Sequence, residues 1–330
     1  MSSNSIAGNQ LVIAHRGASG YLPEHTLEAK AMAYAMGAHY IEQDVVMTRD
    51  DRLIVLHDIT LDRTTDVNLR YPGRSRPDGR YYAIDFTLDE IRTLRVTEGI
   101  DSRKQGREPV YPQRFPVGRS RFRINTLAEE IELIQGLNKS TGGDVGIYPE
   151  IKSPAFHRSE GKDLSRAILL MLKSFGYTTP EHKVFVQTFD HAELKTVHEQ
   201  LLPEFGIQLK LVQLIGTGAE YTWMLTAEGL AKLAVYADGI GPDKSLIYPD
   251  GVQSQELQAS DLVTLAHTNG LQVHPYTFRS DVGQLPGYAR DFSTLLELFF
   301  LGAGVDGIFT DYPDLAVESL ARLRDHAKLR

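Results

Sequence analysis

Short apolar runs alternate with helix-like stretches along almost the whole chain, and this alternation limits the fold more than any other feature. The strand-like runs are 10–14, 39–46, 53–57, 145–151, 183–187, 209–213, 238–241, 271–276 and 306–310, and the helical patterns are 25–36, 126–137, 161–175, 190–201, 225–236, 259–269, 291–302 and 313–327. With 39–46 and the adjoining run 53–57 taken as one unit, we count eight strand positions. Repeated strand–helix units of this number favour a closed parallel (β/α)8 barrel, the TIM barrel, over an open doubly wound sheet.

Polar side chains follow nearly every predicted strand at its C-terminal end. They are His15, Asp44, Glu150, Gln187, Gln213, Tyr276 and Asp311. The active sites of (β/α)8 barrels lie on this face, whereas a doubly wound sheet would concentrate such residues at one crevice. The placement of the polar residues therefore also indicates a barrel.

One stretch, residues 59–125, interrupts the alternation after the second strand unit. It is rich in Arg, Gly, Pro and Asp, and only 87–95 has a convincing helical pattern. We expect a polar inserted segment that caps the barrel mouth within a single domain spanning 1–330. Its basic residues either guide an anionic ligand or form solvated polar surface, and both interpretations stay open.

The composition excludes several classes of protein. A chain of 330 residues with 42% hydrophobic content can bury a large core, and its lack of cysteine excludes disulfides, thiolate zinc sites and cysteine nucleophiles. The net charge of -8 and the pI near 5.8 give no overall basic field, so nucleic acid is a poor candidate partner. No apolar run reaches the roughly 18 residues of a membrane span, so we expect no integral membrane segment.

Three carboxylates predict a metal site. Glu42 and Asp44 lie two apart in a run flanked by apolar residues, so they share one face of a buried strand, and Glu150 lies on another predicted strand. Buried carboxylates must be paired or bound to metal, although a solvated strand face is the alternative for the first two. Because the set is all oxygen, it indicates Ca²⁺ or Mg²⁺ rather than zinc, and a flexible shell of carboxylates and water favours Ca²⁺.

The first predicted strand ends at His15 and Arg16, which the small residues 17–20 follow. Small residues let backbone amides approach an anion, and the guanidinium fork matches phosphate. A core histidine beside a surface arginine is the alternative, since the spacing is neither that of a Walker nor that of a Rossmann loop.

Two more residues have a structural and a functional interpretation. His57 precedes Asp58, which either orients the imidazole for catalysis or forms a buried structural pair with it. Lys152 lies two residues after Glu150, so it either pairs with that carboxylate or faces the charge that develops on phosphorus.

Taken together, the motifs resemble those of the glycerophosphodiester phosphodiesterase family. They are His15-Arg16-Gly17-Ala18, Pro23-Glu24-His25-Thr26, Glu42-Gln43-Asp44, His57-Asp58, Pro149-Glu150-Ile151-Lys152, Gln187-Thr188-Phe189 and the run 304–311. The resemblance runs from about 10 to 325 and looks closest to the periplasmic bacterial type, through the stretches 78–86, 236–242 and 273–277.

The resemblance implies a TIM barrel that hydrolyses glycerophosphodiesters, such as glycerophosphocholine or glycerophosphoethanolamine, to sn-glycerol 3-phosphate and an alcohol. It implies general acid/base roles for His15 and His57, divalent-metal ligands at Glu42, Asp44 and Glu150, and phosphate contacts at Arg16 and Lys152. We expect Gln187, Phe189, Tyr276 and Trp223 around the pocket, with a core position as the alternative for Trp223. His25 departs from the Asn of many relatives, and no role in the chemistry is assigned to it.

Two other functions stay open. A phospholipase C-like or D-like enzyme on lipid substrates would need a hydrophobic rim, whereas the inserted segment is polar and Arg-rich with mostly phenolic aromatics. A catalytically idle surface or binding protein could keep the barrel but would be expected to lack a histidine or a metal carboxylate. For the enzyme interpretation, the nucleophile is either water or, as the resemblance favours, the 2-hydroxyl of the substrate. The sequence does not assign which of the two histidines acts as the acid.

The N-terminal start, Met1-Ser2-Ser3-Asn4-Ser5, lacks the charged and apolar regions of a signal peptide and would fit an initiator that replaces a removed leader. The periplasm is implied by the resemblance alone, with the cytoplasm as the alternative. The expected partners are small-molecule substrates, and a homodimer is left open.

Overall fold

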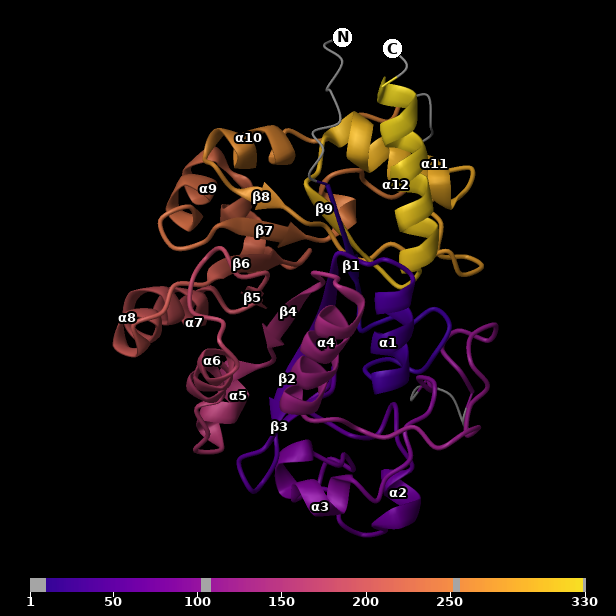
Figure 1. The fold of residues 1–330 in the computed structure, drawn as a ribbon, viewed down its shortest axis with the longest axis vertical. Coiled ribbons are helices and arrows are strands. Elements are labelled where there is room, and N and C mark those ends of the chain that lie inside the picture. Colours follow the sequence, from indigo (N-terminus) through magenta and orange to yellow (C-terminus); the bar gives the residue numbers. More distant parts are fainter. Residues whose placement is uncertain (1–9, 102–107, 252–255, 329–330) are drawn as a thin grey trace.

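The computed structural model describes residues 10–101, 108–251 and 256–328; the polar start discussed above lies outside them. Eight parallel strands form a nearly closed barrel with helices around it (Figure 1), which confirms the predicted fold. The strands are β1 (Leu11–Ala14), β2 (Tyr40–Met47), β4 (Gly146–Ile151), β5 (Phe185–Thr188), β6 (Lys210–Ile215), β7 (Gly239–Pro242), β8 (Gln272–Val273) and β9 (Gly307–Thr310). They pair in the order β8-β7-β6-β5-β4-β2-β1-β9.

The barrel closes between β8 and β9 through backbone beyond the regular strands. The Asp306 amide donates to the Val273 carbonyl at 3.0 Å, and the Phe309 amide donates to the Pro275 carbonyl at 3.0 Å. β8 is two residues long, shorter than the strand expected at 271–276, and Pro275 within that stretch has no amide to donate to a ladder. The extended chain nevertheless completes the wall.

The strand expected at 53–57 lies outside the barrel wall. It forms β3 (Leu53–Val55), which pairs antiparallel with the end of β2 in the register Val45↔Val55 and Met47↔Leu53. The connection 48–52 is too short for the crossover that a parallel partner needs, so only a hairpin can form.

Helices follow the strands around the outside of the barrel. They are α1 (Leu27–Ala35), α4 (Leu127–Thr141), α5 (Pro154–Ser159), α6 (Leu164–Ser174), α7 (His191–Thr196), α8 (Leu202–Phe205), α9 (Ala227–Leu233), α10 (Leu262–Thr268), α11 (Phe292–Glu297) and α12 (Pro313–Lys328). Thr26 caps α1, and Thr126 with Glu129 forms a capping box on α4. The helices expected at 190–201 and 291–302 each end in a π-helical turn, η2 (Val197–Leu201) and η5 (Leu298–Ala303).

The inserted segment has an apolar core of its own rather than an entirely polar character. Phe86, Ile91 and Phe122 are buried with Ile54 of β3 in one cluster. The segment contains α2 (Val67–Arg70), a 3-10 turn η1 (Ala83–Asp85) and α3 (Leu88–Ile91), so the helix expected at 87–95 is much shorter. These elements lie beyond β3 at the lower end of the view in Figure 1.

An aromatic layer fills the barrel interior beneath the mouth. Tyr148 stacks on Phe185 with ring centroids 4.9 Å apart and meets Phe309 edge-on at 5.0 Å. These buried rings form the floor on which the strand-end side chains rest. No helix in the described part of the chain is both long and apolar enough to cross a membrane.

Candidate active site

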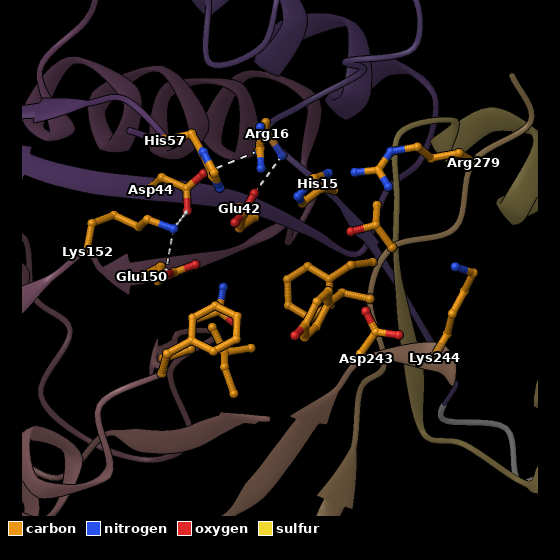
Figure 2. Close-up of a pocket in the computed structure, with 16 residues that line it drawn as sticks. His15, Arg16, Glu42, Asp44, His57, Glu150, Lys152, Asp243, Lys244 and Arg279 are labelled. Carbon is orange, nitrogen blue, oxygen red and sulfur yellow. Dashed lines mark hydrogen bonds and ion pairs between the residues drawn. The ribbon is translucent and has the colours of Figure 1, made fainter. Parts of the chain in front are cut away.

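The C-terminal strand ends meet at a cavity of about 230 Å³ (Figure 2). It is lined by the predicted site residues His15, Arg16, Glu42, Asp44, His57, Glu150, Lys152, Gln187, Phe189 and Tyr276. Trp223 is not among the lining residues; its ring lies 5.5 Å from that of His191. The structure therefore brings all the predicted site residues but one to the same place.

Three carboxylates crowd one side of the cavity. Burial and the neighbouring charge of Asp44 raise the pKa of Glu42, and burial raises the pKa of Glu150 to about 8. Asp44 differs: although burial opposes ionisation, Lys152 and a hydrogen bond from His25 hold the pKa of its carboxyl well below the usual range. Three buried carboxylates repel one another unless positive charge is present.

Lys152 and Arg16 supply part of that positive charge. The Lys152 Nζ lies 2.8 Å from a Glu150 oxygen and 3.6 Å from Asp44 Oδ1 (Figure 2), as expected for side chains two apart on a strand. The Arg16 amide donates to Glu42 at 2.6 Å, and its Nε lies 3.4 Å from Asp44 Oδ2. Arg16 has φ of 61°, so the turn after β1 points both its amide and its side chain toward the carboxylates.

The carboxylates fit a hard divalent cation. Asp44 Oδ1 is buried and accepts no hydrogen bond from the described residues. Glu42 and Glu150 are buried neighbours of Asp44, and burial, together with the charge of Asp44, raises the pKa of both. A buried, all-oxygen donor set of this kind is the environment that Ca²⁺ or Mg²⁺ prefers.

His25, to which the sequence gave no role, lies beside this set. One of its ring nitrogens is within 4.8 Å of oxygens of Glu42 and Asp44, so His25 is a geometric candidate for a ligand. Its Nε2, however, makes a 2.7 Å hydrogen bond to Asp44 Oδ2. The direction of this bond decides whether His25 can bind a cation.

A fully buried lysine fixes that direction. The Lys30 Nζ contacts three acceptors: the Glu42 carbonyl, a Glu130 oxygen at 3.2 Å and His25 Nδ1 at 3.2 Å. An ammonium has three donors and no acceptor, so Nδ1 must accept and the imidazole proton lies on Nε2. His25 therefore donates to Asp44, and its two ring nitrogens are both engaged.

Each candidate catalytic histidine has an aspartate on Nδ1. His15 Nδ1 lies 2.6 Å from Asp311, and His57 Nδ1 lies 2.6 Å from Asp58. An anionic carboxylate on Nδ1 places the proton there and leaves Nε2 as the basic atom. Burial, reinforced by the charge of Arg16, lowers the pKa of both imidazoles to about 4.

Arginines anchor both aspartates. Arg63 Nε lies 3.1 Å from Asp58, while Arg114 Nη2 and Arg279 Nε lie 2.6 Å and 2.8 Å from Asp311. Although burial opposes ionisation, Arg279 and His15 hold the pKa of Asp311 well below its usual range. Arg114 comes from the inserted segment and also makes a two-pronged pair with Asp281.

Several residues in or behind the cavity were missed in the sequence. Asp243, Lys244 and Arg279 line the cavity, and each lies two or three residues beyond a predicted strand. Charged residues just after a strand were the signal, and applying the strand-end argument a few residues further would have found them. Lys30 had no such signal, because its partners come from three separate segments.

Comparisons with known proteins point to one family. A sequence model described as the glycerophosphoryl diester phosphodiesterase family matches residues 15–315. A glycerophosphodiester phosphodiesterase of Haemophilus influenzae is 44% identical over 341 residues, which cover 98% of this chain and 93% of that protein. The corresponding protein of Treponema pallidum is 39% identical over 333 residues, which cover 96% and 93%.

Solved structures share the fold. A glycerophosphoryl diester phosphodiesterase homologue of Silicibacter pomeroyi superimposes with a TM-score of 0.70 at 24% identity and covers 97% of this chain and 95% of its own. An Oleispira antarctica phosphodiesterase, solved in complex with the product sn-glycerol-3-phosphate, has a TM-score of 0.61 at 22% identity and covers 94% and 96%.

Proposed function

The chain belongs to the glycerophosphoryl diester phosphodiesterase family, and on this premise we propose that it hydrolyses glycerophosphodiesters to sn-glycerol 3-phosphate and an alcohol by two-histidine catalysis at a divalent cation. The observation that carries the proposal is the lining of one cavity. Two imidazoles, three carboxylates and two cationic side chains face it, namely His15, His57, Glu42, Asp44, Glu150, Arg16 and Lys152.

The two histidines suit proton transfer in opposite directions. The low pKa values keep both imidazoles neutral at pH 7 in the absence of substrate, so one can accept the proton of the nucleophile at Nε2. The negative charge of a bound phosphodiester favours protonation of the other, which then donates to the leaving alkoxide. His15 and His57 have matching Asp partners, so the assignment of acid and base stays open.

Cationic side chains offset the charge of the substrate. Arg16 and Lys152 border the cavity beside the carboxylates and are positioned to contact the phosphoryl oxygens. Glu42, Asp44 and Glu150 would hold the cation, which we propose to be Ca²⁺, with Mg²⁺ as the alternative. When bound, such an ion offsets charge on the phosphoryl oxygens as the transition state forms.

Release of sn-glycerol 3-phosphate from glycerophosphocholine tests the proposal. The protein is freed of metal with a chelator and assayed alone, with Ca²⁺ and with Mg²⁺, beside His15→Ala and His57→Ala variants. We expect metal-dependent release that falls by a factor of about 10² or more in either variant. Phosphatidylcholine as a second substrate separates this activity from that of a lipid phosphodiesterase, and release that survives the chelator would contradict the role of the cation.

The same assay can detect a cyclic phosphate, which would identify the substrate 2-hydroxyl as the nucleophile.

We further propose that the inserted segment caps the mouth, since Arg114 reaches Asp311 at the strand ends. A periplasmic location rests on the resemblance, and fractionation of cells that express the full gene tests it. Light scattering tests the homodimer.

A further inference from the structure

A second cavity adjoins the catalytic one. It has a volume of about 410 Å³ and shares Glu150, Lys152 and Phe189 with the catalytic cavity. Its other walls come from the loops after β4, β5 and β6, and the last of these includes the 3-10 turn η3 (Ala219–Leu225). A ligand whose phosphate lies between Arg16 and Lys152 would therefore reach this cavity with the group next to the phosphate.

The two cavities differ in charge. The catalytic cavity is lined by four cationic side chains, Arg16, Lys152, Lys244 and Arg279, and by an equal number of carboxylates. Among the residues that line the second cavity, Lys152 at the shared border is the one lysine or arginine. The lining therefore changes from balanced charge in the catalytic cavity to mainly negative charge in the second cavity.

Carboxylates give the second cavity its negative charge. Neither Asp190 nor Glu220 makes an ion pair within the described part of the chain. Asp190 accepts the Glu193 amide at the start of α7, and its charge also acts on Arg158, which is not among the residues that line the second cavity. Burial and the charges of Glu220 and Asp190 raise the pKa of Tyr221, so both carboxylates lie close to that phenol.

Aromatic rings supply the rest of the wall. Phe189 packs edge-on against Tyr221, with centroids 6.2 Å apart, and against Tyr276 at 5.8 Å. Phe156 of α5 also lines the cavity. Aromatic faces combined with nearby carboxylates form the environment that binds quaternary ammonium groups, because the ring quadrupole and the negative charges attract a weakly hydrated cation.

We propose that the second cavity is the subsite for the alcohol portion of the substrate and that it selects a positive charge there. The preferred leaving alcohols are then quaternary ammonium alcohols, followed by primary ammonium alcohols and then by neutral ones. In choline and ethanolamine phosphodiesters, two carbons separate the ester oxygen from the nitrogen, which suits adjoining phosphate and cation sites. The inference rests on the proposed function, since it assigns the headgroup of the same substrate.

The test compares glycerophosphocholine with its neutral isostere, in which a 3,3-dimethylbutyl group replaces choline. The measured quantity is the ratio of kcat/KM for the charged substrate to that for the neutral one. Differences in leaving-group chemistry are the same for every variant and cancel when these ratios are compared. We expect Tyr221→Leu to lower the ratio about 3- to 30-fold, whereas Tyr221→Phe, which keeps the ring face, preserves it.

Glu220→Gln removes a charge at constant size and should lower the ratio about 2- to 5-fold. Glu228→Gln is the matched control, because that carboxylate lies on the exposed surface of α9, where it pairs with Lys232. Since Glu220 is itself exposed, this variant is expected to fold even if the Tyr221 variant does not. Tetramethylammonium chloride should also inhibit hydrolysis of glycerophosphocholine competitively.

The outcomes separate the two proposals. If every variant keeps the ratio of the unmodified protein while all substrates are hydrolysed, the subsite is refuted and the proposed function stands. Equal losses for the charged and neutral substrates also refute charge selection. If the unmodified protein hydrolyses none of the glycerophosphodiesters at any metal concentration, the proposed function fails and the subsite fails with it.

Discussion

Replacing Lys30 with Met tests the buried chain of contacts behind the carboxylates. Lys30 is 0% exposed, and its ammonium is held by Glu130, His25 and the Glu42 carbonyl. Met keeps the length of the side chain but leaves the Glu130 carboxyl, also 0% exposed, without a cation. Breaking a buried ion pair in this way costs about 3–5 kcal/mol, which is a large share of the 5–15 kcal/mol expected for a domain.

The dependence on pH distinguishes charge from packing. In the unmodified protein burial raises the pKa of Glu130 to about 7, so above pH 7 this carboxyl is ionised in both the folded and the unfolded states and adds no slope. Without Lys30 the folded state must keep a proton that the unfolded state has lost. The free energy of unfolding of the variant should then fall by about 1.4 kcal/mol per pH unit above pH 7 relative to the unmodified protein.

Urea unfolding at pH 7, 8 and 9 measures this difference. A Lys30→Met/Glu130→Gln double variant is the control, because it removes both charges and should lose the added slope and recover much of the stability. Burial and the charge of Lys30 lower the pKa of His25 to about 3, so its titration lies well below this range in the unmodified protein. A loss of stability that is independent of pH, or a double variant no more stable than the single one, would refute the ion-pair argument.

Three further predictions follow from the same structure. Asp311→Asn should lower kcat for release of sn-glycerol 3-phosphate about 10²-fold or more, because His15 loses the anion that fixes its tautomer; an unchanged kcat would contradict this. Glu98 is buried with one oxygen unpaired, and burial raises its pKa to about 8. Its ionisation therefore destabilises the fold increasingly as the pH rises from about 4.5 to 8, and Glu98→Gln should raise the free energy of unfolding at pH 8 by about 2–4 kcal/mol. Equal stabilities of the two proteins would refute this prediction. Ca²⁺ at about 100 times its Kd should stabilise the protein by about 2.7 kcal/mol in urea unfolding, and Asp44→Asn should lose most of this gain.

The alternation of strands and helices made the barrel predictable, because each buried parallel strand leaves a continuous apolar run. The end of each run also located His15, Asp44 and Glu150 on the same face. The apolar character of 53–57 is the same in either orientation and hid its hairpin pairing, although the interval after 39–46, too short for a parallel crossover, was a signal for it. The polar composition of the inserted segment likewise hid its apolar core, in which Phe86 and Phe122 are spaced too irregularly to show a period.

The charged partners behind the site were harder to predict for a physical reason. A lysine in a helical pattern is assigned to solvent, since lysines are almost never fully buried unless they are paired. The pair becomes visible only when α1 and α4 are placed side by side, which brings Glu130 within 3.2 Å of Lys30. Arg114 is similar: its partners Asp281 and Asp311 lie more than 160 residues away in the chain.

Lys30 determines the tautomer of His25 and thereby the hydrogen bond that His25 makes to Asp44. A neutral imidazole can carry its proton on either ring nitrogen, and only the Nε2 form donates to Asp44 Oδ2. The ammonium on Nδ1 selects that form, so Oδ2 is engaged by His25 while Oδ1 faces the cavity. A side-chain amide at position 25 could donate without such help, because an amide has no tautomer to select. The buried lysine therefore fixes the tautomer through which His25 orients the Asp44 carboxylate.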